Sequence, residues 1–240
     1  MNTSLIAYSV DGAPYEGVLV YDGSITTKRP AVLLAPDWMG VGDLSVSHAL
    51  RFAKIGYVVF VADMYGIGRR PTNQDEAAAL AGPLKDDIAE ARRRALGALN
   101  ALRSAGANLI TAALPAAVGF CFGGANVLEL CRAGTELSAA ISIHGDLGAH
   151  EPAAPGAIRP PVLVIHGAAD PIAPEAQRHA FEAEMDAAGA RWSMMIFGGA
   201  VHSFTDPGAD VDGMAKYDAD AARWAFRLTE QFLEDAFGIA

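Results

Sequence analysis

A cysteine lies between glycines in the segment Gly119-Phe120-Cys121-Phe122-Gly123-Gly124. An apolar run, Ala116-Ala117-Val118, precedes this segment, and a helical pattern follows it. A tight strand-to-helix turn of this kind raises a nucleophile above a sheet, and its glycines avoid collisions with neighbouring backbone. The helix N-terminus favours a thiolate at Cys121, and the N–H group of Phe122 is a candidate oxyanion donor. The alternative is a buried structural cysteine in a glycine-rich turn.

Two further segments supply a candidate acid and a candidate base. Asp170, just past the apolar run Val162–Ile165, suits a carboxylate that orients an imidazole and fixes its tautomer. The alternative is a turn-forming aspartate before a proline. His202 lies in a glycine-bounded loop after the run Trp192–Phe197, and its alternative is a surface histidine.

The order of the three residues strengthens each assignment. Cys121, Asp170 and His202 follow the order nucleophile, acid, base, which is the order of the α/β-hydrolase fold. Each follows a predicted strand, and ligands of parallel sheets bind beyond the carboxyl ends of the strands. We therefore expect the three side chains to meet, with His144 and Phe204 lining the substrate pocket. The other histidines are expected to be structural or surface residues: His48, His150, His166 and His179.

Short apolar runs alternate with longer amphipathic segments along the chain. This alternation predicts an α/β fold with a mostly parallel, doubly wound sheet of about eight strands and helices on both faces. The predicted strands are Leu5–Val10, Glu16–Tyr21, Ala31–Ala35, Val58–Ala62, Ala116–Phe120, Ala139–Ile143, Val162–His166 and Trp192–Phe197. The predicted helices are Ser45–Lys54, Leu84–Ala105, Gly124–Arg132, Pro174–Ala188 and Met214–Phe237.

Two connections have a specific prediction. Asp11–Gly12 is expected to join the first two strands as an antiparallel hairpin at one edge of the sheet. The segment Met64–Leu84, rich in Gly, Pro and polar residues, is a candidate for a mobile lid. No repeat, low-complexity tract or charge block divides the sequence, so residues 1–240 are expected to form a single domain.

Composition limits the partners. The net charge of −10 disfavours nucleic acid and anionic membrane surfaces. No apolar stretch of about 18 residues predicts a membrane span, and no signal peptide is expected. Two cysteines, Cys121 and Cys131, are too few for a disulfide framework, so a cytoplasmic protein with a packed Cys131 is expected. No metal-ligand spacing and no nucleotide-binding motif occur, so neither metal nor cofactor is expected. The expected partner is a small-molecule ester or lactone, and the expected state is a monomer or homodimer.

The motifs Gly-Phe-Cys-Phe-Gly-Gly, His-Gly-Ala-Ala-Asp-Pro and Gly-Ala-Val-His-Ser-Phe resemble those of the dienelactone hydrolase family. The resemblance runs from about Leu33 to the last predicted helix. It implies carboxymethylenebutenolidase-type hydrolysis of an enol-lactone without a cofactor. The family's catalytic Cys, Asp and His correspond to Cys121, Asp170 and His202, and its second oxyanion N–H corresponds to that of Trp38.

The sequence departs from the family pattern at two places. Asp37 stands where the archetype has a Glu, whose implied role is to hold the resting thiol; an ordinary loop-capping aspartate is the alternative. Asp206 stands where the archetype has an Arg that binds the substrate carboxylate. The segment Gln74–Ala79 lacks the second such Arg, and Arg69 and Arg70 are out of register with it. Because a paired Arg–carboxylate clamp supplies binding energy and orientation, its loss predicts a substrate without that carboxylate.

The expected function is therefore hydrolysis of a small ester or lactone through a Cys-His-Asp triad and a thioester acyl-enzyme. Two alternatives stay open. One is a short-chain carboxylesterase or thioesterase that acts on neutral substrates. The other is a non-catalytic binding module with a hydrolase fold.

Overall fold

The computed structural model describes residues 1–239 of the chain. The chain divides into two units, Met1–Ala117 and Val118–Ala240. The first contains β1 (Asn2–Val10), β2 (Ala13–Tyr21), β3 (Ala31–Ala35), α1 (Asp43–Lys54), β4 (Val58–Val61), α2 (Gln74–Asp86) and α3 (Ile88–Ala105). The second contains β5 (Ala116–Phe120), whose first residues precede the boundary, α4 (Phe122–Arg132), β6 (Ala140–Ile143), β7 (Val162–Gly167), α5 (Glu175–Ala187), β8 (Trp192–Phe197), β9 (Asp210–Val211), β10 (Ala215–Lys216) and α6 (Ala219–Phe237).

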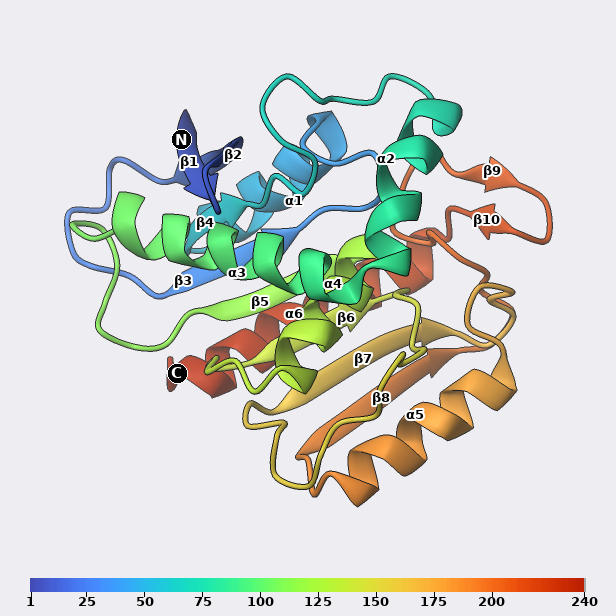
Figure 1. The fold of residues 1–240 in the computed structure, drawn as a ribbon. Coiled ribbons are helices and arrows are strands. Elements are labelled where there is room, and N and C mark those ends of the chain that lie inside the picture. The colour runs from blue at the N-terminus through green and yellow to red at the C-terminus, as the bar shows by residue number, and fades with distance from the viewer. Residues whose placement is uncertain (240) are drawn as a thin grey trace. The chain divides into compact units, whose positions relative to one another are not determined.

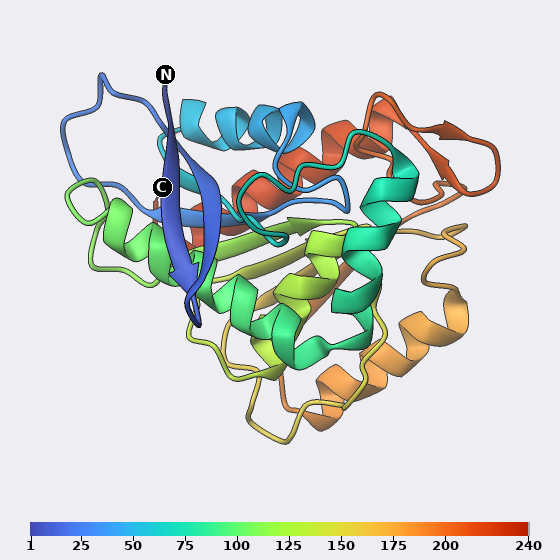
Figure 2. The ribbon, with the colours of Figure 1, turned by 45° about the horizontal axis from the view of Figure 1, so that its top comes forward.

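In the first unit the strands are hydrogen-bonded in the order β1-β2-β4-β3. β2 pairs with β4 antiparallel, whereas β3 pairs with β4 parallel. Every residue of β3 and β4 is buried, because α1 and α3 cover opposite faces of these strands (Figure 1, Figure 2). Such two-sided burial explains why both strands are continuous apolar runs rather than alternating ones.

The predicted N-terminal hairpin is confirmed. β1 and β2 pair antiparallel, with Val10 opposite Ala13, and β1 lies at the edge of the strand order. The two turn residues have positive φ angles, 49° at Asp11 and 83° at Gly12. Positive φ at both positions gives the turn a twist that matches the right-handed twist of the two strands.

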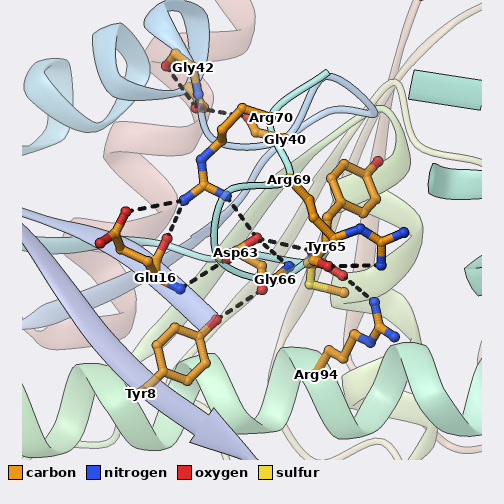
Figure 3. A network of polar contacts seen from close by, with 12 residues as sticks. Tyr8, Glu16, Gly40, Gly42, Asp63, Tyr65, Gly66, Arg69, Arg70 and Arg94 are labelled. Carbon is orange, nitrogen blue, oxygen red and sulfur yellow. Dashed lines mark hydrogen bonds and ion pairs between the residues drawn. The ribbon is translucent and has the colours of Figure 1, made fainter. Parts of the chain in front are cut away.

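A buried carboxylate ties the segment after β4 to β2 in the first unit (Figure 3). Asp63 is 1% exposed, and its Oδ2 accepts the N–H of Glu16 at 2.9 Å. Its Oδ1 accepts the N–H groups of Tyr65 and Gly66, each at 3.0 Å, and forms an ion pair with Arg70 at 3.1 Å. Main-chain donors and one cation therefore surround this carboxylate and fix the start of the segment.

Two further side chains bind the main chain of the same segment. The Tyr8 hydroxyl donates to the carbonyl of Asp63 at 2.9 Å, and burial, followed by the nearby Asp63 charge, raises the pKa of Tyr8. Arg94 donates to the carbonyl of Met64 at 2.8 Å. β1 and α3 thus both hold the chain where it leaves β4.

In the second unit the strand order is β5-β6-β7-β8, and β7 pairs parallel with both β6 and β8. α4 and α5 lie on one face of these strands and α6 lies on the other (Figure 2). Within residues 1–239 these two orders account for eight strands, as the sequence predicts, and β9 and β10 form a separate pair. Within residues 1–239, no helix combines the length and the apolar character that crossing a membrane requires.

One predicted helix is two helices in the structure. The prediction of Leu84–Ala105 is wrong at its start, because α2 runs through Asp86 and α3 begins at Ile88. The Asp87 side chain accepts the N–H of Glu90 at 2.9 Å and so caps α3. Much of the candidate lid is also helical, since α2 begins at Gln74; whether the segment moves stays a prediction.

A second predicted helix, Met214–Phe237, begins too early. Ala215 and Lys216 form the short strand β10, and α6 begins only at Ala219. The side chain of Asp218 caps this helix, because it accepts the N–H groups of Asp220 and Ala221, each at 3.0 Å.

Candidate active site

Cys121 occupies the turn between β5 and α4, as the glycine pattern predicts. Its backbone has φ 53° and ψ −118°, and a positive φ is uncommon for a residue other than glycine. A Cβ atom at Gly119 would lie 2.1 Å from the carbonyl oxygen of Gly123, so only glycine fits there. The turn thus forces the cysteine into a strained backbone conformation at the first turn of a helix.

The structure brings together the three side chains that the sequence predicts to meet, all within the second unit. The Nε2 atom of His202 lies 2.9 Å from Cys121 Sγ, and its Nδ1 atom lies 2.9 Å from Asp170 Oδ2. Because a carboxylate only accepts hydrogen bonds, Nδ1 carries a proton and Nε2 faces the sulfur. Asp170 is 2% exposed and is itself oriented by the N–H of Ile172, at 2.8 Å from its Oδ1.

The surroundings of His202 favour the protonated ring. Burial opposes the charge, but hydrogen bonds to Asp170 and Cys121 outweigh burial and raise the pKa of His202 to about 10. A protonated Nε2 beside Sγ stabilises a thiolate, as does the N-terminus of α4. This arrangement can supply an ionised sulfur nucleophile together with a proton donor for a leaving group.

The short hairpin of β9 and β10 forms hydrogen bonds with both main-chain groups of His202, its N–H and its carbonyl. The His202 N–H donates to the carbonyl of Met214 at 3.2 Å, and the Lys216 N–H donates to the carbonyl of His202 at 3.0 Å. Sequence reasoning missed this support, because strands of two residues are too short to have a recognisable periodicity.

His144 lies at the end of β6 with a φ of 40°, and its ring contacts two loops of the site. Its Nδ1 atom accepts the N–H of Cys121 at 3.1 Å, and its Nε2 atom lies 2.7 Å from Thr205 Oγ1. His144 is 2% exposed and Phe204 is 0% exposed. Their predicted pocket-lining role stays a prediction. Thr205 could not be found from the sequence, because its partner His144 lies 61 positions away along the chain.

The remaining predicted residues lie in loops and at a helix start. Asp37 Oδ1 accepts the N–H of Met39 at 2.8 Å, and the Trp38 carbonyl accepts the hydroxyl of Tyr65 at 2.7 Å. Phe122 is the first residue of α4. Oxyanion binding by Phe122 and Trp38, and action of Asp37 on the thiol, stay predictions.

Cys131 differs from Cys121 in its surroundings. It is 1% exposed inside α4, and burial raises the pKa of its thiol to about 12. It is therefore a protonated, packed thiol at neutral pH. His166 is also buried, with Nε2 2.9 Å from the carbonyl of Ala173. Among residues 1–239, no cluster of three His, Cys, Asp or Glu side chains is arranged to hold a metal ion.

Comparisons of the sequence and of the structure with known proteins agree with each other. Residues 16–237 match the model of the dienelactone hydrolase family. The structure is similar to that of a dienelactone hydrolase-like promiscuous phosphotriesterase, P91, from metagenomic libraries. The two are 32% identical with a TM-score of 0.90, over 97% of this chain and 98% of that one. This likeness confirms the predicted fold class.

Two other similarities are more distant or shorter. A dienelactone hydrolase from Anabaena variabilis shares the fold at 20% identity, with a TM-score of 0.69 over 97% of each chain. The uncharacterized protein K02A2.1 of Caenorhabditis elegans is 34% identical over 145 residues, which make up 58% of this chain and 90% of that protein.

Proposed function

The chain belongs to the dienelactone hydrolase family and is a carboxylic ester hydrolase, and on this premise we propose that Cys121 is its nucleophile. The substrate is a small ester or lactone, and the acyl group passes through a thioester on Sγ. The single observation that carries this proposal is the pair of 2.9 Å contacts that join Sγ, the His202 ring and Asp170.

The proposed acylation step begins with attack of the Cys121 thiolate on the carbonyl carbon. The new S–C bond pushes an electron pair onto the carbonyl oxygen, where the N–H groups of Phe122 and Trp38 are the proposed donors. As the tetrahedral intermediate collapses, the ester C–O bond breaks. His202 gives its Nε2 proton to the leaving oxygen and becomes neutral.

Deacylation reverses these roles. The neutral Nε2 of His202 takes a proton from water while the water oxygen attacks the thioester carbonyl. The C–S bond breaks, the acid is released, and the sulfur leaves as a thiolate beside a ring that is protonated again. Asp170 keeps the imidazole in one orientation throughout, and it stabilises the imidazolium.

The charges of two segments support a substrate without a carboxylate. Arg70 is engaged within the first unit, by an ion pair with Asp63 and a hydrogen bond to the carbonyl of Glu16. The Asp206 carboxylate, which stands in place of an Arg, accepts the N–H of Gly208 at 2.8 Å in a turn. We therefore favour neutral short-chain esters over carboxylate-bearing dienelactones as substrates.

The nucleophile is tested with p-nitrophenyl acetate and two matched cysteine variants. Cys121→Ala is expected to lower kcat by about 10³-fold or more, because the reaction loses its covalent step. Cys131→Ala is the control and is expected to keep kcat within about twofold, since this thiol is packed away from the reaction. Mass spectrometry of the wild-type protein under rapid quench should find one acetyl group on Cys121. Undiminished turnover by Cys121→Ala would contradict the proposal.

The substrate class is tested with a panel that contrasts neutral esters, thioesters and dienelactones. Higher kcat/KM for the neutral esters supports the short-chain esterase, and higher kcat/KM for the dienelactones contradicts the proposed preference. A phosphotriester belongs in the panel, since the similar P91 protein is described as a phosphotriesterase. A Cys121 thiol that reacts with iodoacetamide no faster than free cysteine would instead favour a non-catalytic binding module.

A further inference from the structure

The His144 ring joins the loop that carries Cys121 to the loop that carries His202. We propose that His144 is a positioning residue, which holds the Cys121 turn and the Thr205 end of the His202 loop at the spacing that their reaction needs. The inference rests on the proposed function, in which Cys121 and His202 are the nucleophile and the base.

The partners of the ring determine where its proton lies. A backbone N–H can only donate, so the Nδ1 atom that accepts from Cys121 carries no proton. In the neutral ring the proton is then on Nε2, which donates to Thr205 Oγ1 at 2.7 Å. His144 is therefore a neutral link with a fixed direction, from the Cys121 amide through the ring to the Thr205 hydroxyl.

The link acts on a strained part of the backbone. Cys121 and His144 both have positive φ angles, 53° and 40°, which non-glycine residues adopt only where their surroundings hold them. The Cys121 N–H is shared between the carbonyl of Ile143 at 3.0 Å and His144 Nδ1 at 3.1 Å. Two acceptors from adjacent residues thus fix the amide of the nucleophile in this conformation.

The ring also packs against the base. Its centroid lies 5.3 Å from that of His202 in an edge-to-face contact, and 4.9 Å from that of Phe204 in a second one. Because His144 is neutral in this arrangement, it can contact the protonated His202 ring without adding a like charge. The neutral His144 ring thus holds the position of His202 and does not oppose the positive charge of that ring.

Three variants separate the two ends of the link. His144→Asn places Oδ1 where Nδ1 was and tolerates positive φ, so it keeps an acceptor for Cys121 but loses Thr205. Thr205→Val cuts the link at the other end with little change of shape. His144→Phe keeps an aromatic ring against His202 and removes both hydrogen bonds.

The readouts are the rate and pH profile of Cys121 alkylation by iodoacetamide, together with kcat/KM for p-nitrophenyl acetate. His144→Asn and Thr205→Val are each expected to lower the alkylation rate at neutral pH by about fivefold, the equivalent of one hydrogen bond. The double variant is expected to match the single ones, because both changes cut the same bond. His144→Phe is expected to lower the rate by about 25-fold and to move the midpoint of the pH profile upward.

The proposal is overturned if folded His144→Phe protein alkylates with the wild-type rate and pH profile, or if His144→Asn is as slow as His144→Phe. If His144→Phe does not fold, the decision passes to the Asn and Val variants, and additive losses in their double variant also overturn it. Alkylation is measured without an ester. Absence of ester hydrolysis by the wild-type protein therefore contradicts the proposed function alone, while the alkylation series still decides the role of His144.

Discussion

Asp63 in the first unit and Asp170 in the second are buried carboxylates with contrasting polar contacts. Asp63 accepts three backbone N–H groups and pairs with Arg70, so its contacts end on groups that do not react. Asp170 accepts one backbone N–H and the His202 ring, whose other nitrogen faces a half-buried sulfur. The contacts of Asp63 include no reactive group, whereas the contacts of Asp170 lead through His202 to one reactive atom, the sulfur of Cys121.

The difference shows what the partner of a buried carboxylate decides. Main-chain donors and a permanently charged Arg have one protonation state at neutral pH, so the Asp63 contacts can only fix the chain. A histidine changes its charge and has two distinct nitrogens, so Asp170 transmits its influence to the sulfur. The Asp63 contacts should therefore matter for stability, and the Asp170 contacts for reactivity.

The largest expected effect comes from a change in the Asp170 contacts. Asp170→Asn, which leaves the histidine without its orienting charge, is expected to lower kcat for p-nitrophenyl acetate by about 10³- to 10⁴-fold. The midpoint of thermal unfolding should change by only a few degrees, because His202, unlike Arg70, can lose its proton and then leaves no buried charge unpaired. Steady-state kinetics and calorimetry on the same preparation measure both quantities. A variant that loses stability but keeps kcat would reverse the comparison.

The next largest effect is expected for the Asp63 contacts. Asp63→Asn is expected to lower the free energy of unfolding by about 3 kcal/mol, because Arg70 and the main-chain donors lose a charged acceptor. Urea unfolding measures this loss, and kcat per folded molecule should stay near the wild-type value. Glu136→Gln is the control, since its ion pair with Arg159 is exposed and should contribute less than about 1 kcal/mol.

The pKa values of His48 and His202 are shifted in opposite directions. Burial, with a smaller effect of Arg51, lowers the pKa of His48 to about 4, whereas the pKa of His202 is raised to about 10. The stability that neutral His48 provides is present above its ordinary pKa of 6.5 and is lost as the pH falls through about 4, by up to about 1.4 kcal/mol per pH unit.

Nitrogen-detected NMR of the imidazoles measures both titrations directly. His202 should stay protonated until the pH approaches 10, and Cys121→Ala should lower its pKa, because the sulfur contributes to the upward shift. His48→Gln should reduce the slope of the unfolding free energy between pH 6.5 and about 4. A neutral His202 at pH 7 in the wild-type protein would contradict the proposed ion pair.

The smallest expected effect is the loss of a single hydrogen bond in the first unit. Tyr8→Phe removes the donor to the Asp63 carbonyl and is expected to lower the free energy of unfolding by about 1 kcal/mol. Urea unfolding with Asp63→Asn and the double variant shows whether the two changes are coupled. A loss above about 3 kcal/mol would mean that the hydroxyl, rather than the carboxylate, dominates this region.

The elements with strong local signals could be predicted from the sequence. Ala31–Ala35, Ala116–Phe120 and Trp192–Phe197 have the predicted bounds, because each is an apolar run with turn residues beyond it. The break at Asp87 was missed, since the helical pattern continues across it and only the capping side chain interrupts it. The two-residue strands β9 and β10 depend on pairing with each other and not on their own sequence.

The site, like the fold, has parts with a local sequence signal and parts that depend on contacts between distant residues. Cys121, Asp170 and His202 could be predicted to meet, because each follows a strand and their order is informative. The contact of His144 with Thr205 could not, since it joins residues 61 positions apart without any motif between them. Local chemistry at strand ends is readable from a sequence, whereas the packing that aligns two loops is not.

The hairpin of β9 and β10 couples the proposed base to a short, exposed element. His202 is bonded to the hairpin through both its N–H and its carbonyl, and Val211 and Met214 in that hairpin are 48% and 45% exposed. Short elements with exposed side chains open locally at a lower free energy than the core. Deuterium exchange at the His202 and Lys216 amides should then report the fraction of molecules with a misaligned base. On heating, activity is expected to decline before the protein unfolds as a whole.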